Sequence, residues 1–143
     1  MTQHDPFGNL REWGPVIDLL DELANSDKLV ECQRGLVRIL RYKGNWRLRE
    51  EVLKRIVGIP SPSDELVSQV LTILSDDNIY YEARVLASNA LIELLKNSQS
   101  SLPQESILEI RTIIEKLNKS PQPPLLENAI KKLDSEIGPP RAA

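Results

Sequence analysis

The sequence has almost none of the residues from which metal sites, disulfides and nucleophilic centres are built. Its 143 residues include one cysteine, Cys32, and one histidine, His4. A single cysteine cannot form an internal disulfide, which is typical of proteins in a reducing compartment. Cys32 lies on the apolar face of a predicted helix, with no residue nearby in sequence that would lower its pKa. We therefore expect a packed thiol, no metal site and no Ser-His-Asp triad.

Phosphate-binding loops and membrane-spanning segments are missing too. The six glycines are scattered, and none forms a glycine-rich loop before a helix. No apolar run approaches the roughly 20 residues needed to cross a bilayer, and the polar, acidic residues 1–14 do not resemble a signal peptide. Adjacent carboxylates such as Glu50-Glu51 and Asp76-Asp77 are typical of solvated surface. We predict a cytoplasmic protein that is not an enzyme, with no cofactor, metal or membrane contact.

Aromatic residues are scarce as well, at 4% of the chain, whereas hydrophobic residues make up 41%. The core must therefore consist mainly of Leu, Ile and Val. Between breaks rich in Pro, Gly and Asn these residues recur with helical period, and no segment alternates with the period of a strand. The pattern predicts an all-α fold of about seven helices, at approximately 15–25, 28–42, 46–57, 64–74, 79–96, 103–117 and 125–137.

The same breaks divide the chain into three parts. Residues 15–137 form the predicted helical domain. Residues 1–14 are expected to be a partly flexible N-terminal segment, because they are polar and carry no helical period. The Gly-Pro-Pro sequence that follows residue 137 stops the last helix, so residues 138–143 are expected to form a flexible tail.

Two short patterns recur along the chain at the spacing of a helix pair. The segment 27–30, DKLV, returns 37 residues later at 64–67 as DELV. The apolar-arginine pattern of 48–56 returns 35 residues later at 83–91. Such a period is typical of an α-solenoid, in which each helix pair buries its apolar face against the next pair.

The segment 76–94 resembles a HEAT repeat, and residues 83–91 carry the resemblance through the motif Ala-Arg-x-x-Ala-x-x-Ala-Leu. The small residues of the motif would let a neighbouring helix approach closely. The resemblance covers about residues 27–137 and implies a short right-handed α-solenoid of antiparallel helix pairs, with the first helix as a cap. The structural repeat positions that it implies are Arg49, Arg84, Ala87, Ala90 and Leu91.

The resemblance also implies a ladder of charged residues. The family often pairs an acid before the second helix of a repeat with the arginine of an adjacent repeat. Asp76 or Asp77 and Arg84 could serve in the middle pair. The first pair has Arg49 but no acid in the turn before it, and the third has Pro123 where the arginine would fall. We therefore expect an incomplete ladder.

The net charge of −3 conceals a basic segment. Residues 28–58 carry nine Lys and Arg against three acids, whereas 1–27 and 59–143 are both acidic. Arg34, Arg38 and Arg41 fall within about 60° of one another on a helical wheel, and we call them the arginine stripe. The candidate binding residues are the stripe and those at the turn after it, namely Arg34, Arg38, Arg41, Tyr42, Lys43, Trp46 and Arg47.

The basic segment leaves several functions open. Clustered arginines beside aromatic rings can hold phosphates or stack on bases, and they can equally bind an acidic protein. They can also remain solvated, or pair with the acids of the first helix, Asp18, Asp21 and Glu22. We predict a protein-interaction module or scaffold whose partner has an acidic surface, with no particular oligomeric state implied. Nucleic-acid binding is the alternative, although a pI near 5.3 argues against it. A further alternative is an accessory subunit resembling the HEAT-type components of bilin lyases.

Overall fold

The computed structural model describes residues 5–98 and 104–137, apart from the side chains of residues 97 and 98. Regular structure in this part of the chain is entirely helical, with no strand, which confirms the all-α prediction. The α-helices are α1 (Trp13–Asn25), α2 (Gln33–Arg41), α3 (Trp46–Arg55), α4 (Asp64–Ser75), α5 (Tyr81–Ser98), α6 (Gln104–Asn118) and α7 (Pro124–Ile137), and two 3₁₀-helices are η1 (Leu29–Cys32) and η2 (Ile56–Gly58). Residues 1–4 and the predicted tail, 138–143, lie outside the described residues.

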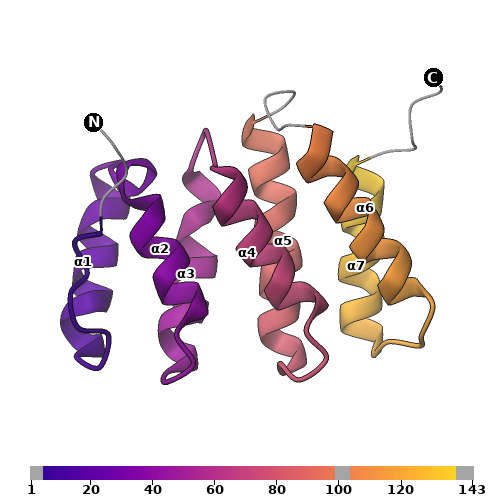
Figure 1. Cartoon of the computed structure of the whole chain (residues 1–143), viewed down its shortest axis with the longest axis horizontal. Helices are drawn as coiled ribbons and strands as arrows, with labels where there is room; N and C mark the ends of the chain where they lie inside the picture. The colour runs from indigo at the N-terminus through magenta and orange to yellow at the C-terminus, as the bar shows by residue number, and fades with distance from the viewer. Residues whose placement is uncertain (1–4, 99–103, 138–143) are drawn as a thin grey trace.

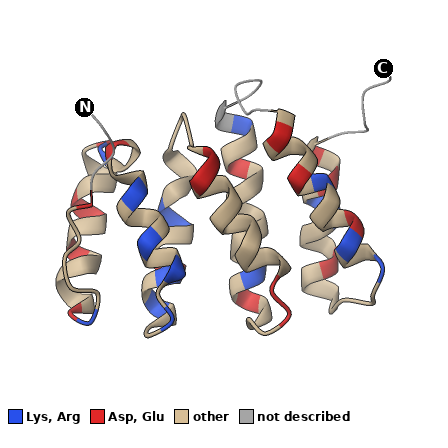
Figure 2. Ribbon diagram, in the orientation of Figure 1, with Lys and Arg blue, Asp and Glu red and all other residues tan. Residues whose placement is uncertain are grey.

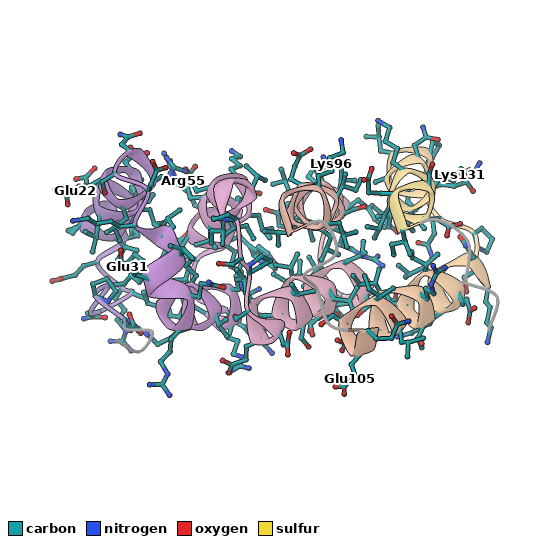
Figure 3. All side chains as sticks on the ribbon, turned by 90° about the horizontal axis from the view of Figure 1, so that it is seen from above. Glu22, Glu31, Arg55, Lys96, Glu105 and Lys131 are labelled. Atoms are coloured by element: carbon teal, nitrogen blue, oxygen red, sulfur yellow. The ribbon has the colours of Figure 1, made fainter. Side chains whose placement is uncertain are left out.

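The helices stand in two rows (Figures 1 and 3). One row holds α1, α3, α5 and α7, each packed against the next, and the other holds α2, α4 and α6. Successive helices run in opposite directions, so the turns 42–45, 76–80 and 119–123 lie along one edge, at the bottom of Figure 1. We call this edge the turn edge.

An aliphatic core lies between the rows. Its buried residues come from every α-helix, including Leu20, Leu36, Leu48, Leu66, Leu91, Ile110 and Leu133. Ala87 and Ala90 on α5 are 0% and 1% exposed, so the helix packed most extensively in the molecule carries small residues on its buried face. Ser88 is also buried, and its hydroxyl donates a hydrogen bond to the carbonyl oxygen of Ala129 on α7 at 2.9 Å.

Local capping explains where several helices begin. The side-chain oxygen of Asn45 accepts a hydrogen bond from the backbone N–H of Arg47 at 2.9 Å, and α3 starts there. Ser63 caps α4 in the same way, by accepting from the N–H of Leu66 at 3.1 Å. Each cap satisfies a backbone donor that a helix leaves without an internal partner.

The predicted helix 28–42 is divided into η1 and α2, contrary to the sequence pattern. Gln33, only 2% exposed, donates its side-chain amide to the carbonyl oxygens of Val30 and Ser61, both at 3.1 Å. Its side-chain oxygen accepts from the N–H of Ser63 at 2.6 Å. The tertiary bonds to Ser61 and Ser63 hold the start of α2 against the loop before α4. Asp27 does not cap this helix and has a positive φ of 58°.

Residues 5–12, which we call the N-terminal strap, belong to the packed body. Phe7 and Leu10 are 5% and 6% exposed and join the core. The packed body therefore extends ten residues further towards the N-terminus than the helical domain predicted from residue 15. No sequence pattern indicates this, because the strap has no regular secondary structure and its two apolar residues show no period.

Candidate binding surface at the turn edge

The three arginines of the arginine stripe have different environments in the structure. Arg38 pairs with Asp5 of the N-terminal strap through two hydrogen bonds, one of them Nη2 to Oδ1 at 3.0 Å, and it also donates to the carbonyl oxygen of Gly8 at 2.9 Å. The hydrogen bond to Asp5 raises the pKa of Arg38. Arg41 donates Nε to the side-chain oxygen of Gln69 on α4 at 2.8 Å. Arg34 is exposed.

The first helix is not the partner of the stripe, so that hypothesis is wrong. Helix α1 lies in the row of α3, whereas the stripe is on α2 in the other row (Figure 3). Asp21 of α1 accepts a hydrogen bond from Nε of Arg55 at 3.1 Å, and Arg55 also binds Glu51. Burial alone would lower the pKa of Arg55, but the hydrogen bonds to these two carboxylates raise it.

Aromatic rings and guanidinium groups are in contact at several points along the turn edge. The guanidinium carbon of Arg47 lies 5.4 Å from the ring centroid of Trp13, at the start of α1. The guanidinium of Arg49 lies 4.2 Å from the ring of Trp46, at the start of α3. Both distances are within the range of a cation–π contact.

The row of rings continues to the start of α5. The ring of Trp46 meets Tyr80 edge-on, with the centroids 5.2 Å apart, and Arg84 lies 5.8 Å from the ring of Tyr81. We call Trp13, Trp46, Tyr80 and Tyr81 the aromatic row. Trp13, Tyr80 and Tyr81 are 46%, 37% and 48% exposed, so a protein with very few aromatic residues shows most of this group to solvent.

A depression of about 470 Å³ opens between the first two helix pairs, and we call it the inter-pair pocket. Its lining includes Arg41 at the end of α2, Lys43 in the turn, Trp46 and Arg49 on α3, and Asp76 after α4. Three cations and one acid therefore face the same hollow. Lys and Arg are concentrated on α2 and α3 in Figure 2, in agreement with this lining.

Six of the seven predicted binding residues lie at three places, and Arg34, exposed on α2, belongs to none of them. Arg41, Lys43 and Trp46 line the inter-pair pocket. Arg38 and Tyr42 line an adjoining depression of about 410 Å³, together with Arg41 and residues 9–11 of the strap. Arg47 stands beside Trp13 on the row of α1 and α3.

Arg49 is a buried cation of this surface. It is 5% exposed, and its Nε has no hydrogen-bond partner within the part of the chain that the structure describes. Burial lowers its pKa, which the charge of Asp76 opposes. Asp76 belongs to the next helix pair and acts on Arg49 without forming an ion pair.

Arg84, the equivalent residue of the next pair, has a different environment. It is 2% exposed, and its Nε donates to the carbonyl oxygen of Leu74 at 2.8 Å. Its Nη2 lies 3.5 Å from Asp77, which is an ion-pair contact without hydrogen-bond geometry. The end of α4 therefore anchors Arg84, while the corresponding bond is missing at Arg49. The sequence motif treats the two arginines as equivalent.

Trp46 was among the predicted binding residues, whereas the other members of the aromatic row, Trp13, Tyr80 and Tyr81, were not. Trp13, Trp46 and Tyr81 are spaced 33 and 35 residues apart, close to the helix-pair period, and each begins a helix of the same row. This repeat of aromatic positions would have revealed the row. The contact between Asp5 and Arg38 has no comparable signal, because it joins residues 33 positions apart.

Other kinds of site are not seen in residues 5–98 and 104–137. No group of three or more His, Cys, Asp or Glu side chains there could hold a metal ion. The helices of these ranges are also too short or too polar to cross a membrane. Cys32 is 1% exposed, and burial raises its pKa, assisted by the charges of Glu31 and Asp5.

Comparison with known proteins returns no significant match. No family model matches the chain, and neither a curated protein nor a solved structure does. Function is therefore inferred from the geometry of the turn edge.

Proposed function

We propose that the protein is an interaction module without catalytic activity, built as a short right-handed HEAT-like α-solenoid. The two rows of antiparallel helices support this, with α2–α3, α4–α5 and α6–α7 as repeating pairs and α1 with the N-terminal strap as the cap. The buried arginines at equivalent places in two pairs support it further. Stacked helices of this kind present a rigid wall on which a partner docks.

The aromatic row is the observation that carries the proposal. Trp, Tyr and Arg are the residues most enriched at the energetic centres of protein interfaces. Here they lie side by side along one edge, and three of the rings are more than one-third exposed. An extended segment of a partner protein lying along the turn edge would cover these rings.

The charges around the row favour an acidic protein segment over nucleic acid. A nucleic-acid strand carries a negative charge about every 3.4 Å. Asp77 and Glu82 are exposed at the α5 end of the row, and Glu50 accepts a hydrogen bond from the hydroxyl of Tyr80. These acids would repel an evenly charged backbone. A peptide with spaced carboxylates can place them beside the cations alone. The single, buried cysteine fits a cytoplasmic location.

Site-specific photocrosslinking tests the proposal. A benzophenone amino acid replaces Tyr81 on the aromatic row or, as a control, Thr112, which is exposed on α6. We expect one acidic protein to be crosslinked from position 81 and not from position 112. Replacing both Trp13 and Tyr81 with Ala should abolish binding of that purified partner while leaving the helical circular dichroism unchanged. Crosslinking to an oligonucleotide, or from position 112 alone, would contradict the proposal.

A further inference from the structure

The buried Nε of Arg49 lacks a hydrogen-bond acceptor among the described residues. A buried polar group without a hydrogen bond is costly, and native proteins leave few of them. Arg84 shows how the same position is satisfied inside the fold, by the carbonyl oxygen of Leu74. At Arg49 no such acceptor is supplied by the described residues, and the residue lines an open pocket. An acceptor that enters this pocket from outside can therefore approach the guanidinium of Arg49.

The pocket is built to hold a planar anion. The guanidinium of Arg49 stacks on Trp46 at 4.2 Å, which orients the fork of donors that matches the two oxygens of a carboxylate. Arg41 is held in place by its hydrogen bond to Gln69. Lys43 is exposed at the same pocket and supplies a third cation.

We infer that the inter-pair pocket is a subsite for one carboxylate, the side chain of an Asp or Glu in the partner segment, with Arg49 as its main ligand and Arg41 and Lys43 beside it. This inference rests on the proposed function and specifies the chemistry of its partner. With one carboxylate bound, the pocket keeps a small net positive charge, because three cations face Asp76 and the carboxylate. Asp76 disfavours a dianion or a run of phosphates, since a second negative charge would lie next to it.

Trp46 reports on the pocket directly. The chain contains two tryptophans, so replacing Trp13 with Phe leaves Trp46 as the only indole and keeps an aromatic ring in the row. Titration of this variant with hexaglutamate should change the Trp46 fluorescence and reach saturation. Hexaglutamine, which lacks the carboxylates, should cause no saturable change.

Substitutions in the W13F background identify the residues responsible. R49M should weaken hexaglutamate binding by about tenfold or more, because both donors of a charge-assisted pair are lost. R49K keeps the charge but not the planar fork and should be intermediate. K43Q should weaken binding by a few fold. K132Q is the matched control for K43Q, because Lys132 is exposed on α7 outside the pocket lining, and its affinity should be unchanged.

Three results would overturn the inference. These are no saturable response to hexaglutamate, equal affinities of R49M and the parent, or stronger competition by inorganic phosphate or a single-stranded oligonucleotide of equal charge. If the circular dichroism of R49M differs from that of the parent, the variant is misfolded and R49K and K43Q replace it. Equal hexaglutamate affinities of these two variants and the parent would then overturn the inference. The hexaglutamate titration tests the carboxylate subsite, and crosslinking from position 81 tests the proposed function. A negative titration does not change the expected crosslinking, so the two can be rejected independently.

Discussion

The ring of Phe7 lies so close to Gly35 that a Cβ atom at position 35 would stand 2.6 Å from Cδ2 of the ring. It would also stand 2.8 Å from Oδ1 of Asp5, the carboxylate that binds Arg38. Gly35 is in the interior of α2, where glycine costs about 0.5–1 kcal/mol relative to alanine. The glycine therefore makes room for the N-terminal strap at the expense of helix propensity.

The substitution Gly35→Ala should destabilise the protein although it favours the helix. Displacing Phe7 and Asp5 should lower the free energy of unfolding by about 1–3 kcal/mol, measured by urea denaturation. Gly14→Ala in α1 is the control, because nothing lies within 4 Å of a Cβ there, and it should be neutral or stabilising. Equal stabilisation by both substitutions would show that the strap does not depend on Gly35.

Reversing the charge of single arginines of the arginine stripe should show that Arg38 holds the N-terminal strap and Arg34 does not. Arg38→Glu places an acid beside Asp5 and should weaken the attachment of the N-terminal strap, so that the strap opens more often and proteolysis near Phe7 is faster. The loss in unfolding free energy should stay below about 1 kcal/mol, because the side chain of Arg38 is 42% exposed and solvent screens the pair. Arg34→Glu should leave proteolysis unchanged. Identical cleavage of the two variants would argue against the Asp5 contact.

Overpacking the interior of α5 should be costly. Ala90 is 1% exposed on the face that also carries Leu91 and Leu94, so Ala90→Leu adds volume where none is free. We expect a loss of about 1–3 kcal/mol in unfolding free energy. Asn89→Leu, at the exposed neighbouring position, should change stability by less than about 0.5 kcal/mol. An unchanged urea midpoint for Ala90→Leu would contradict this packing.

The buried thiol of Cys32 should make stability depend on alkaline pH. Burial, with smaller effects of Glu31 and Asp5, raises its pKa above the ordinary value of 9.0. The folded state therefore favours the protonated thiol. Its contribution to stability is complete below pH 9.0 and is lost as the pH rises above that value.

The comparison with Cys32→Ala isolates this effect. The unfolding free energy of the parent should fall more steeply above pH 9.0 than that of the variant, because the variant lacks the thiol and keeps every other ionisable group. A thiol reagent should react with Cys32 only on unfolding, since the residue is 1% exposed. Parallel pH profiles, or rapid reaction in the native state, would place the thiol at the surface.

Much of the fold could be predicted because its signals are local. Helical period and the Pro, Gly and Asn breaks located all the α-helices within residues 5–98 and 104–137. Asn45 and Ser63 cap α3 and α4 by accepting from backbone N–H groups two and three residues further along the chain, which is a local interaction as well. The exception is the start of α2, where Gln33 bonds to Ser61 and Ser63. Those partners are distant in sequence, so no window of sequence contains them.

The candidate site was predictable only in part, for the same reason. Helical spacing alone puts Arg34, Arg38 and Arg41 on one face of α2. It does not say which acid faces them, and the strap supplied Asp5 where the first helix was expected. The turn edge likewise collects rings from the starts of α1, α3 and α5, which are about a helix pair apart in the chain.

The sequence by itself determined that the described chain is helical and approximately where its helices lie, apart from the start of α2, since propensity, capping and amphipathic period act over a few residues. Only the tertiary structure decided which polar groups are satisfied. Arg49 and Arg84 stand in matching motifs, but Arg84 meets the carbonyl oxygen of Leu74 and the Nε of Arg49 meets no acceptor among the described residues. That difference depends on how the end of one helix lies against the next, because a hydrogen bond is made or lost within a few tenths of an ångström.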